Sequence, residues 1–93
     1  MPRTVTQLKE IFAAVLQEPI ENITDQAGPR TLKSWDSLRH VELVIEVENS
    51  FGVSFNPTEV FAMTSFLGFR NALTRKGVVL DVDGVSGRAE RAT

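Results

Sequence analysis

The stretch SWDSLRHVELVIEVENSFGVSF, residues Ser34–Phe55, decides the fold because it predicts a helix with more apolar surface than one core needs. Asp36 is a typical N-cap residue, since its carboxylate can accept a backbone N–H of the first turn. Gly52 is a typical helix stop, since glycine readily adopts the left-handed conformation that ends many helices. We therefore expect a helix from Ser37 to about Phe51.

The apolar residues of this helix fall on two faces when successive residues are placed at roughly 100° intervals. The first face is an ordinary core stripe that contains His40, Leu43, Val44, Val47 and Phe51. The second is a strip of Leu38, Val41 and Ile45, bordered by Arg39, Glu42, Glu46 and Glu48. This strip is either buried, as in a central helix enclosed on two sides, or an exposed docking patch with a charged rim. Both alternatives stay open on the sequence alone.

Three further helices are expected along the chain. Thr4 and Gln7 have the spacing of a capping box, and apolar residues at helical spacing follow until near Pro19. A short helix is expected from Pro57 to about Met63, with Asn56 as its cap. A last helix is expected after a cap at Thr64 or Ser65 and should end at Gly77. The sum is an all-α protein, a small four-helix bundle with three main helices and a short third one.

The segments between and after these helices are expected to behave differently from one another. Residues 19–35 read as a long loop, which needs apolar anchors to the core: Ile20, Ile23, Leu32 and Trp35. Residues 78–93 read as a C-terminal tail that is extended or partly disordered. We expect an extended strip against the body at Val78, Val79, Leu80 and Val82, and disorder from Gly84 onward.

The composition excludes several kinds of site. The 93 residues include no cysteine and one histidine, which excludes disulfides and thiolate metal sites and argues against zinc, so no metal is expected. No apolar run is long enough to span a membrane, and the N-terminus lacks the apolar core of a signal peptide, so a cytoplasmic protein is expected. Residues 36–69 carry five acidic side chains and one basic one, which argues against nucleic acid as a partner and suits a basic partner surface.

Ser37 follows the N-cap of the decisive helix and allows three interpretations. The first is structural, since serine is tolerated near a helix start. The second is a hydrolytic triad with Asp36 and His40. Geometry argues against it, because Asp36 and Ser37 project about 100° apart and His40 turns toward the core. We therefore interpret His40 as a packed helix residue and expect no catalytic residue. The third interpretation is attachment of a phosphodiester, which the positive end of the helix dipole favours.

The sequence DSLRHVELVIEVENSFGVSF resembles the acyl carrier protein family, in which D-S-L is followed by a helix of the form xxVELVxxxExxFxxxF. The resemblance extends over nearly the whole chain to Gly77 and implies a carrier domain at residues 1–77 with the acyl-carrier type of four-helix bundle. It implies that Ser37 bears 4′-phosphopantetheine from coenzyme A, whose thiol holds an acyl or aminoacyl group as a thioester. The protein would then be no enzyme but a carrier that presents substrates to enzymes.

The resemblance also implies partners and the residues that contact them. The expected partners are a phosphopantetheinyl transferase, an acyl- or aminoacyl-activating ligase and acyl-transferring enzymes, with the carrier a monomer. The residues that match the family's partner-binding positions are Asp36, Leu38, Val41, Glu42, Ile45 and Glu48. Arg39 is a further docking residue, and it reverses the charge at its position. Partners other than those of the fatty-acid cycle are therefore expected.

The motif WDSL is more similar to the corresponding motif of free-standing carriers of polyketide, peptide or aminoacyl pathways than to that of carriers of bacterial fatty acid synthesis. The identity of the cargo stays open. The alternative function is a carrier-like helical interaction module that is never modified. Trp35 is interpreted as a loop aromatic that packs into the core, and contact with the arm is the lesser alternative.

Overall fold

The helix α2 (Ser37–Phe51) begins and ends at the residues that the sequence predicts. In this computed structural model, which describes residues 3–81, the Asp36 carboxylate accepts the Arg39 N–H at 2.9 Å. At the other end Gly52 has a φ of 67°, in the left-handed region, and its N–H donates to the Glu48 carbonyl oxygen at 2.9 Å. Both caps satisfy backbone groups that a helix end leaves without partners.

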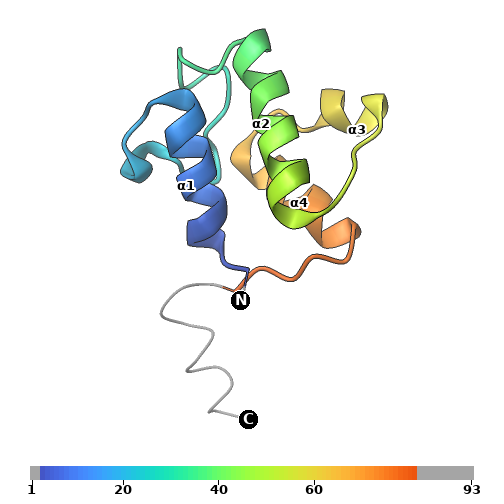
Figure 1. Cartoon of the computed structure of the whole chain (residues 1–93). Coiled ribbons are helices and arrows are strands. Elements are labelled where there is room, and N and C mark those ends of the chain that lie inside the picture. The colour runs from blue at the N-terminus through green and yellow to red at the C-terminus, as the bar shows by residue number, and fades with distance from the viewer. Residues whose placement is uncertain (1–2, 82–93) are drawn as a thin grey trace.

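The helix α1 (Val5–Leu16) lies beside α2, and a long loop connects the two (Figure 1). The Thr4 hydroxyl accepts the Gln7 N–H at 3.0 Å, so the predicted cap is confirmed. Among the described residues, only this half of the predicted capping box forms. The helix ends earlier than the proline signal indicates, because Gln17 adopts a left-handed conformation with a φ of 56°.

The loop over residues 19–35 contains a short 3-10 helix, η1 (Ile20–Asn22), that the sequence analysis does not predict. Three of the predicted anchors are confirmed, since Ile23, Leu32 and Trp35 are buried. The prediction for Ile20 is wrong: its side chain is 37% exposed, because it begins η1, which buries none of its residues. Ala27 is buried instead, and its carbonyl oxygen accepts the Phe66 N–H at 2.8 Å, which ties the loop to the start of α4.

Two shorter helices complete the fold. The helix α3 (Pro57–Ala62) has a complete capping box, in which Asn56 and Glu59 each accept the other's backbone N–H. The helix α4 (Phe66–Arg75) begins after Ser65, whose hydroxyl accepts the Gly68 N–H at 3.0 Å. The predicted all-α fold with four helices and a short third one is confirmed within the described residues.

The core lies between α1, α2, α4 and the loop, with Phe12 at its centre. The Phe12 ring meets Trp35, Phe66 and Phe69 edge to face, with centroids 5.4, 5.0 and 4.9 Å away. Edge-to-face pairs are favourable beyond the area that they bury. Trp35 is therefore a core residue, which confirms the interpretation of this loop aromatic.

Residues 78–81 return under the helices to the beginning of α1 (Figure 1). Asp81 donates its N–H to the Arg3 carbonyl oxygen at 2.8 Å and accepts the Val5 N–H at 2.9 Å, forming one parallel bridge. Val78 is buried and Leu80 half-buried, as expected for an extended strip, whereas Val79 is exposed. The expectations for Val82 and for the segment from Gly84 onward lie outside the described residues, and the division at residue 77 stays a proposal.

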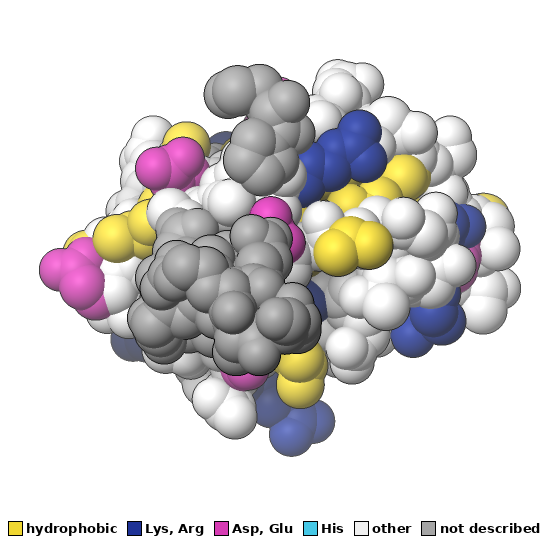
Figure 2. Space-filling model, turned by 90° about the horizontal axis from the view of Figure 1, so that it is seen from below, with side chains coloured by type: hydrophobic (Ala, Val, Ile, Leu, Met, Phe, Trp, Pro, Cys, Tyr) yellow, Lys and Arg dark blue, Asp and Glu magenta, His cyan; other side chains and the backbone are white. Residues whose placement is uncertain are grey.

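In the view from below, the hydrophobic side chains that are visible among the described residues lie in small groups between charged and polar ones (Figure 2). Among residues 3–81, none of the helices combines the length and the apolar content that a membrane crossing needs.

Candidate functional site

Ser37 is the first residue of α2, and its side chain is exposed. Asp36 already caps the helix through the Arg39 N–H, so the serine is not needed for that task. Within residues 3–81, no hydrogen bond to the Ser37 hydroxyl is formed. The hydroxyl is thus accessible, and the first N–H groups of the helix lie around it, where the helix dipole favours a negative group.

The structure does not form a hydrolytic triad from Asp36, Ser37 and His40. Both ring nitrogens of His40 are engaged elsewhere: Nδ1 accepts the Trp35 Nε1–H at 3.1 Å, and Nε2 lies 2.9 Å from the Val60 carbonyl oxygen. Because a carbonyl only accepts and the indole only donates, these partners assign the neutral Nε2–H tautomer. His40 is half-buried, which confirms its interpretation as a packed helix residue.

A cavity of about 570 Å³ opens beside Ser37, between α2, α3 and the preceding loop. It is lined by Pro29, Trp35, Asp36, Ser37, His40, Val41, Val60, Phe61 and Thr64. The Phe61 side chain is 80% exposed and forms part of its apolar wall. Sequence reasoning missed Phe61, because a helix of six residues has too few turns for periodicity to assign its faces.

The second apolar strip of α2 is exposed: Leu38, Val41 and Ile45 expose 64%, 51% and 48% of their surface. The alternative in which this strip is buried is therefore wrong. The core stripe is buried at Leu43, Val44, Val47 and Phe51, so one helix serves both the core and the surface. Large side chains exposed together next to charged ones are typical of protein interaction sites.

The charged residues around the strip differ in their surroundings. Arg39 and Glu42 form an ion pair at 2.8 Å, and this hydrogen bond raises the pKa of Arg39 above its usual value. The pair therefore brings opposite charges together at the border of the exposed strip. The Glu48 carboxylate accepts the Phe55 N–H at 2.8 Å, so it also holds the loop between α2 and α3. A contact between Glu48 and partners stays a prediction.

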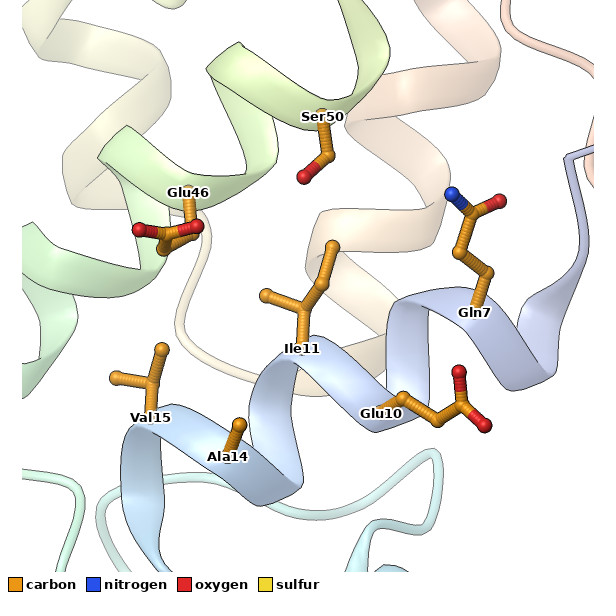
Figure 3. A pocket seen from close by; sticks show the side chains of 7 residues that line it. All are labelled: Gln7, Glu10, Ile11, Ala14, Val15, Glu46 and Ser50. Carbon is orange, nitrogen blue, oxygen red and sulfur yellow. The ribbon is translucent and has the colours of Figure 1, made fainter.

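A second hollow of about 480 Å³ lies between α1 and α2 and does not include Ser37 (Figure 3). Ile11 and Val15 point from α1 toward Glu46 and Ser50 of α2. We place the functional site at the other cavity, because that one contains the accessible hydroxyl and adjoins the exposed strip.

Comparisons with known proteins agree on one kind of protein. The family model described as phosphopantetheine attachment site matches residues 6–73, which include Ser37 and all of α2. Polyketide-8 synthase acyl carrier protein 2 of Streptomyces avermitilis is 33% identical over 82 residues, covering 82% of this chain and 94% of that protein. Acyl carrier protein 3 of Ralstonia nicotianae is 32% identical over 62 residues, covering 67% of this chain and 71% of that protein.

Proposed function

This chain belongs to the acyl carrier protein family, and we propose that the Ser37 hydroxyl is where its 4′-phosphopantetheine arm is attached. The observation that carries the proposal is the place of Ser37, exposed at the start of α2 and at the edge of the cavity. When bound, the arm supplies a terminal thiol that holds an acyl group as a thioester. The chain contains no cysteine, so it has no thiol of its own for this chemistry.

The residues around Ser37 fit such a group. A phosphodiester at this position lies at the positive end of α2, near backbone N–H groups that have no partner in a preceding turn. The Asp36 carboxylate would repel such a phosphate, but it accepts the Arg39 N–H, which disperses part of its charge. Beyond the phosphate, the apolar side chains of Val41, Val60 and Phe61 offer a surface to the arm.

We propose further that the exposed strip is the face that partner enzymes bind. Leu38, Val41 and Ile45 supply an apolar centre next to Ser37, and the rim consists of Asp36, Arg39, Glu42 and Glu48. A phosphopantetheinyl transferase must approach Ser37 over this face, and so must the enzymes that load and use the thioester. The excess of acids in residues 36–69 favours partner surfaces that carry Lys and Arg.

The pathway that we propose is a specialised one of the polyketide kind, served in the cytoplasm by a monomeric carrier. The support is the likeness to a carrier named for a polyketide synthase, over 94% of that protein's length. The Arg39–Glu42 ion pair also supports this pathway, because the pair makes the face around the strip less acidic than acidic residues at both positions would. An activating ligase or an acyl-transferring enzyme then supplies the cargo.

The attachment is tested by intact-mass measurement after co-expression with a phosphopantetheinyl transferase. We expect the wild-type chain to gain the mass of one phosphopantetheine, and Ser37→Ala to gain none. Ser50→Ala is the matched control, because Ser50 is an exposed serine at the other end of the same helix, and it should be modified like the wild type. An unmodified wild-type chain with a competent transferase would support an interaction module that is never modified.

A further inference from the structure

The cavity beside Ser37 is bounded by two aromatic side chains that also contact the core. Trp35 and His40 line the cavity, and both lie against Phe69 of α4, with ring centroids 6.1 and 5.8 Å away. Trp35 also meets Phe12 edge to face at 5.4 Å. Phe12 and Phe69 are fully buried, and within residues 3–81 neither of them is among the residues that line the cavity. Trp35 and His40 therefore lie between the cavity and the core, and we call these two side chains the aromatic wall.

Hydrogen bonds hold the aromatic wall together across three elements. The Trp35 indole N–H donates to His40 Nδ1 at 3.1 Å, and the His40 Nε2–H donates to the Val60 carbonyl oxygen at 2.9 Å. The wall thus connects the loop before α2, α2 itself and α3, which lies on the side of α2 away from α1 (Figure 1). Val60 also packs against the core. An acyl chain would pass the wall only if these groups moved apart, and that would leave half-buried polar atoms without partners.

The core behind the wall is filled by aromatic rings. Trp35 exposes 2% of its surface, and Phe12, Phe66 and Phe69 expose none. Rings that interlock edge to face at about 5 Å leave no room for an additional chain. Among the described residues, every buried side-chain nitrogen or oxygen already has a hydrogen-bond partner. The core therefore offers neither volume to an acyl chain nor a free polar side chain to an oxygenated one.

We propose that the aromatic wall determines which cargo this carrier suits, because it keeps the acyl group out of the core and leaves it in the open cavity against Val41 and Phe61. The proposal rests on the proposed attachment of the arm at Ser37. Because Phe61 is 80% exposed, a long saturated chain in this cavity stays in contact with water. The suited cargo is a short acyl group, or one with carbonyl or hydroxyl groups that keep their hydration in an open cavity.

The test compares backbone amide chemical shifts of the full chain loaded with an acetyl or an octanoyl arm. A phosphopantetheinyl transferase attaches each arm from the corresponding acyl-coenzyme A, and intact mass verifies the loading. The two wild-type forms should differ at the amides of Val41, Phe61 and Thr64, whose residues line the cavity. They should not differ at the amides of Phe12 and Phe69. Differences at these two core amides as large as those at the cavity overturn the proposal.

Variants of Trp35 test whether the wall is what excludes the chain. Trp35→Ala leaves a cavity beside Phe12, so its octanoyl form should differ from its acetyl form at the Phe12 and Phe69 amides. The octanoyl form of this variant should also melt at least about 5 °C higher, because the chain becomes buried. Trp35→Phe is the matched control, since it keeps a flat ring in the wall and should behave like the wild type. An equal rise in Tm in all three proteins contradicts the proposal.

A second probe judges the wall independently of Ser37. Benzene enters apolar cavities of protein cores and needs no arm. Dissolved benzene should shift the Phe12 and Phe69 amides of Trp35→Ala and leave those of the wild type unchanged, whereas equal responses overturn the wall. Trp35→Leu takes the place of Trp35→Ala if the alanine variant does not fold. If the wild-type chain is never loaded at Ser37, the proposed function fails, and the benzene result still decides whether the wall closes the core.

Discussion

The division of α2 into a core stripe and a docking strip makes a quantitative prediction for Ile45→Ala and Leu43→Ala. Leu43 is fully buried, whereas Ile45 exposes 48% of its surface, although the two lie only two residues apart. Full burial of such a side chain stabilises a protein by about 1.5–3 kcal/mol. Since Ile45 is about half buried, Ile45→Ala removes about half of that stabilisation, and we expect the free energy of unfolding to fall by roughly 1 kcal/mol. The better helix propensity of alanine offsets part of this loss. Leu43→Ala leaves a core cavity and should cost roughly 3–5 kcal/mol.

The assay combines urea unfolding with the kcat/KM of phosphopantetheine transfer. Ile45→Ala should lower kcat/KM by about tenfold if Ile45 is an anchor of the interface, since truncation of such residues costs more than about 1 kcal/mol. Leu43→Ala should lose more stability than Ile45→Ala. Under conditions in which it is still folded, its kcat/KM should fall by less than that of Ile45→Ala. The reasoning is refuted if Ile45→Ala loses as much stability as Leu43→Ala, or if it is modified as fast as the wild type.

Two further predictions concern the loop and α3. Gly28→Ala should lower the Tm by an amount equivalent to about 1–3 kcal/mol, because its Cβ would lie 2.6 Å from the Thr64 carbonyl oxygen, and overpacking costs that much. Gly68→Ala is the control, since its closest contacts are 3.4 Å, and equal Tm values for the two variants would contradict the argument. Glu59→Gln tests the ion pair between Glu59 and Lys76. The hydrogen bond from Lys76 lowers the pKa of Glu59 most, and the hydrogen bond from the Asn56 N–H lowers it further. Because the folded-state pKa is depressed, the stabilisation is present above the usual Glu range and is lost as the pH falls through the lowered value. The urea midpoints of wild type and Glu59→Gln should therefore converge on acidification, and a pH-independent difference would argue against the pair.

Helix boundaries were the most predictable part of this fold, because they depend on groups close in sequence. Asp36, Asn56 and Ser65 each accept the N–H three residues later, as the cap signals indicate. The end of α1 was less predictable, since Gln17 adopts a left-handed conformation without being glycine. The proline signal at Pro19 therefore placed this end a few residues too far along the chain.

The candidate site was predictable only in part. Periodicity separated Leu38, Val41 and Ile45 from the core stripe, but it could not decide whether a second element covers them. The position of Phe61 depends on how a short helix is docked, and the two bonds of His40 depend on groups 5 and 20 residues away. Interactions over such separations leave no local pattern in a single sequence.

The sequence by itself determined the four α-helices, the core stripe of α2 and the serine at its beginning, because caps and periodicity are local properties of the chain. Only the tertiary structure decided that the second strip is exposed, that a cavity adjoins Ser37, and that His40 bridges Trp35 and α3. It also decided that Asp81 pairs beside Thr4, at the beginning of α1. The physical reason is that exposure and side-chain partners follow from which elements pack together, and packing brings together residues that are distant in sequence.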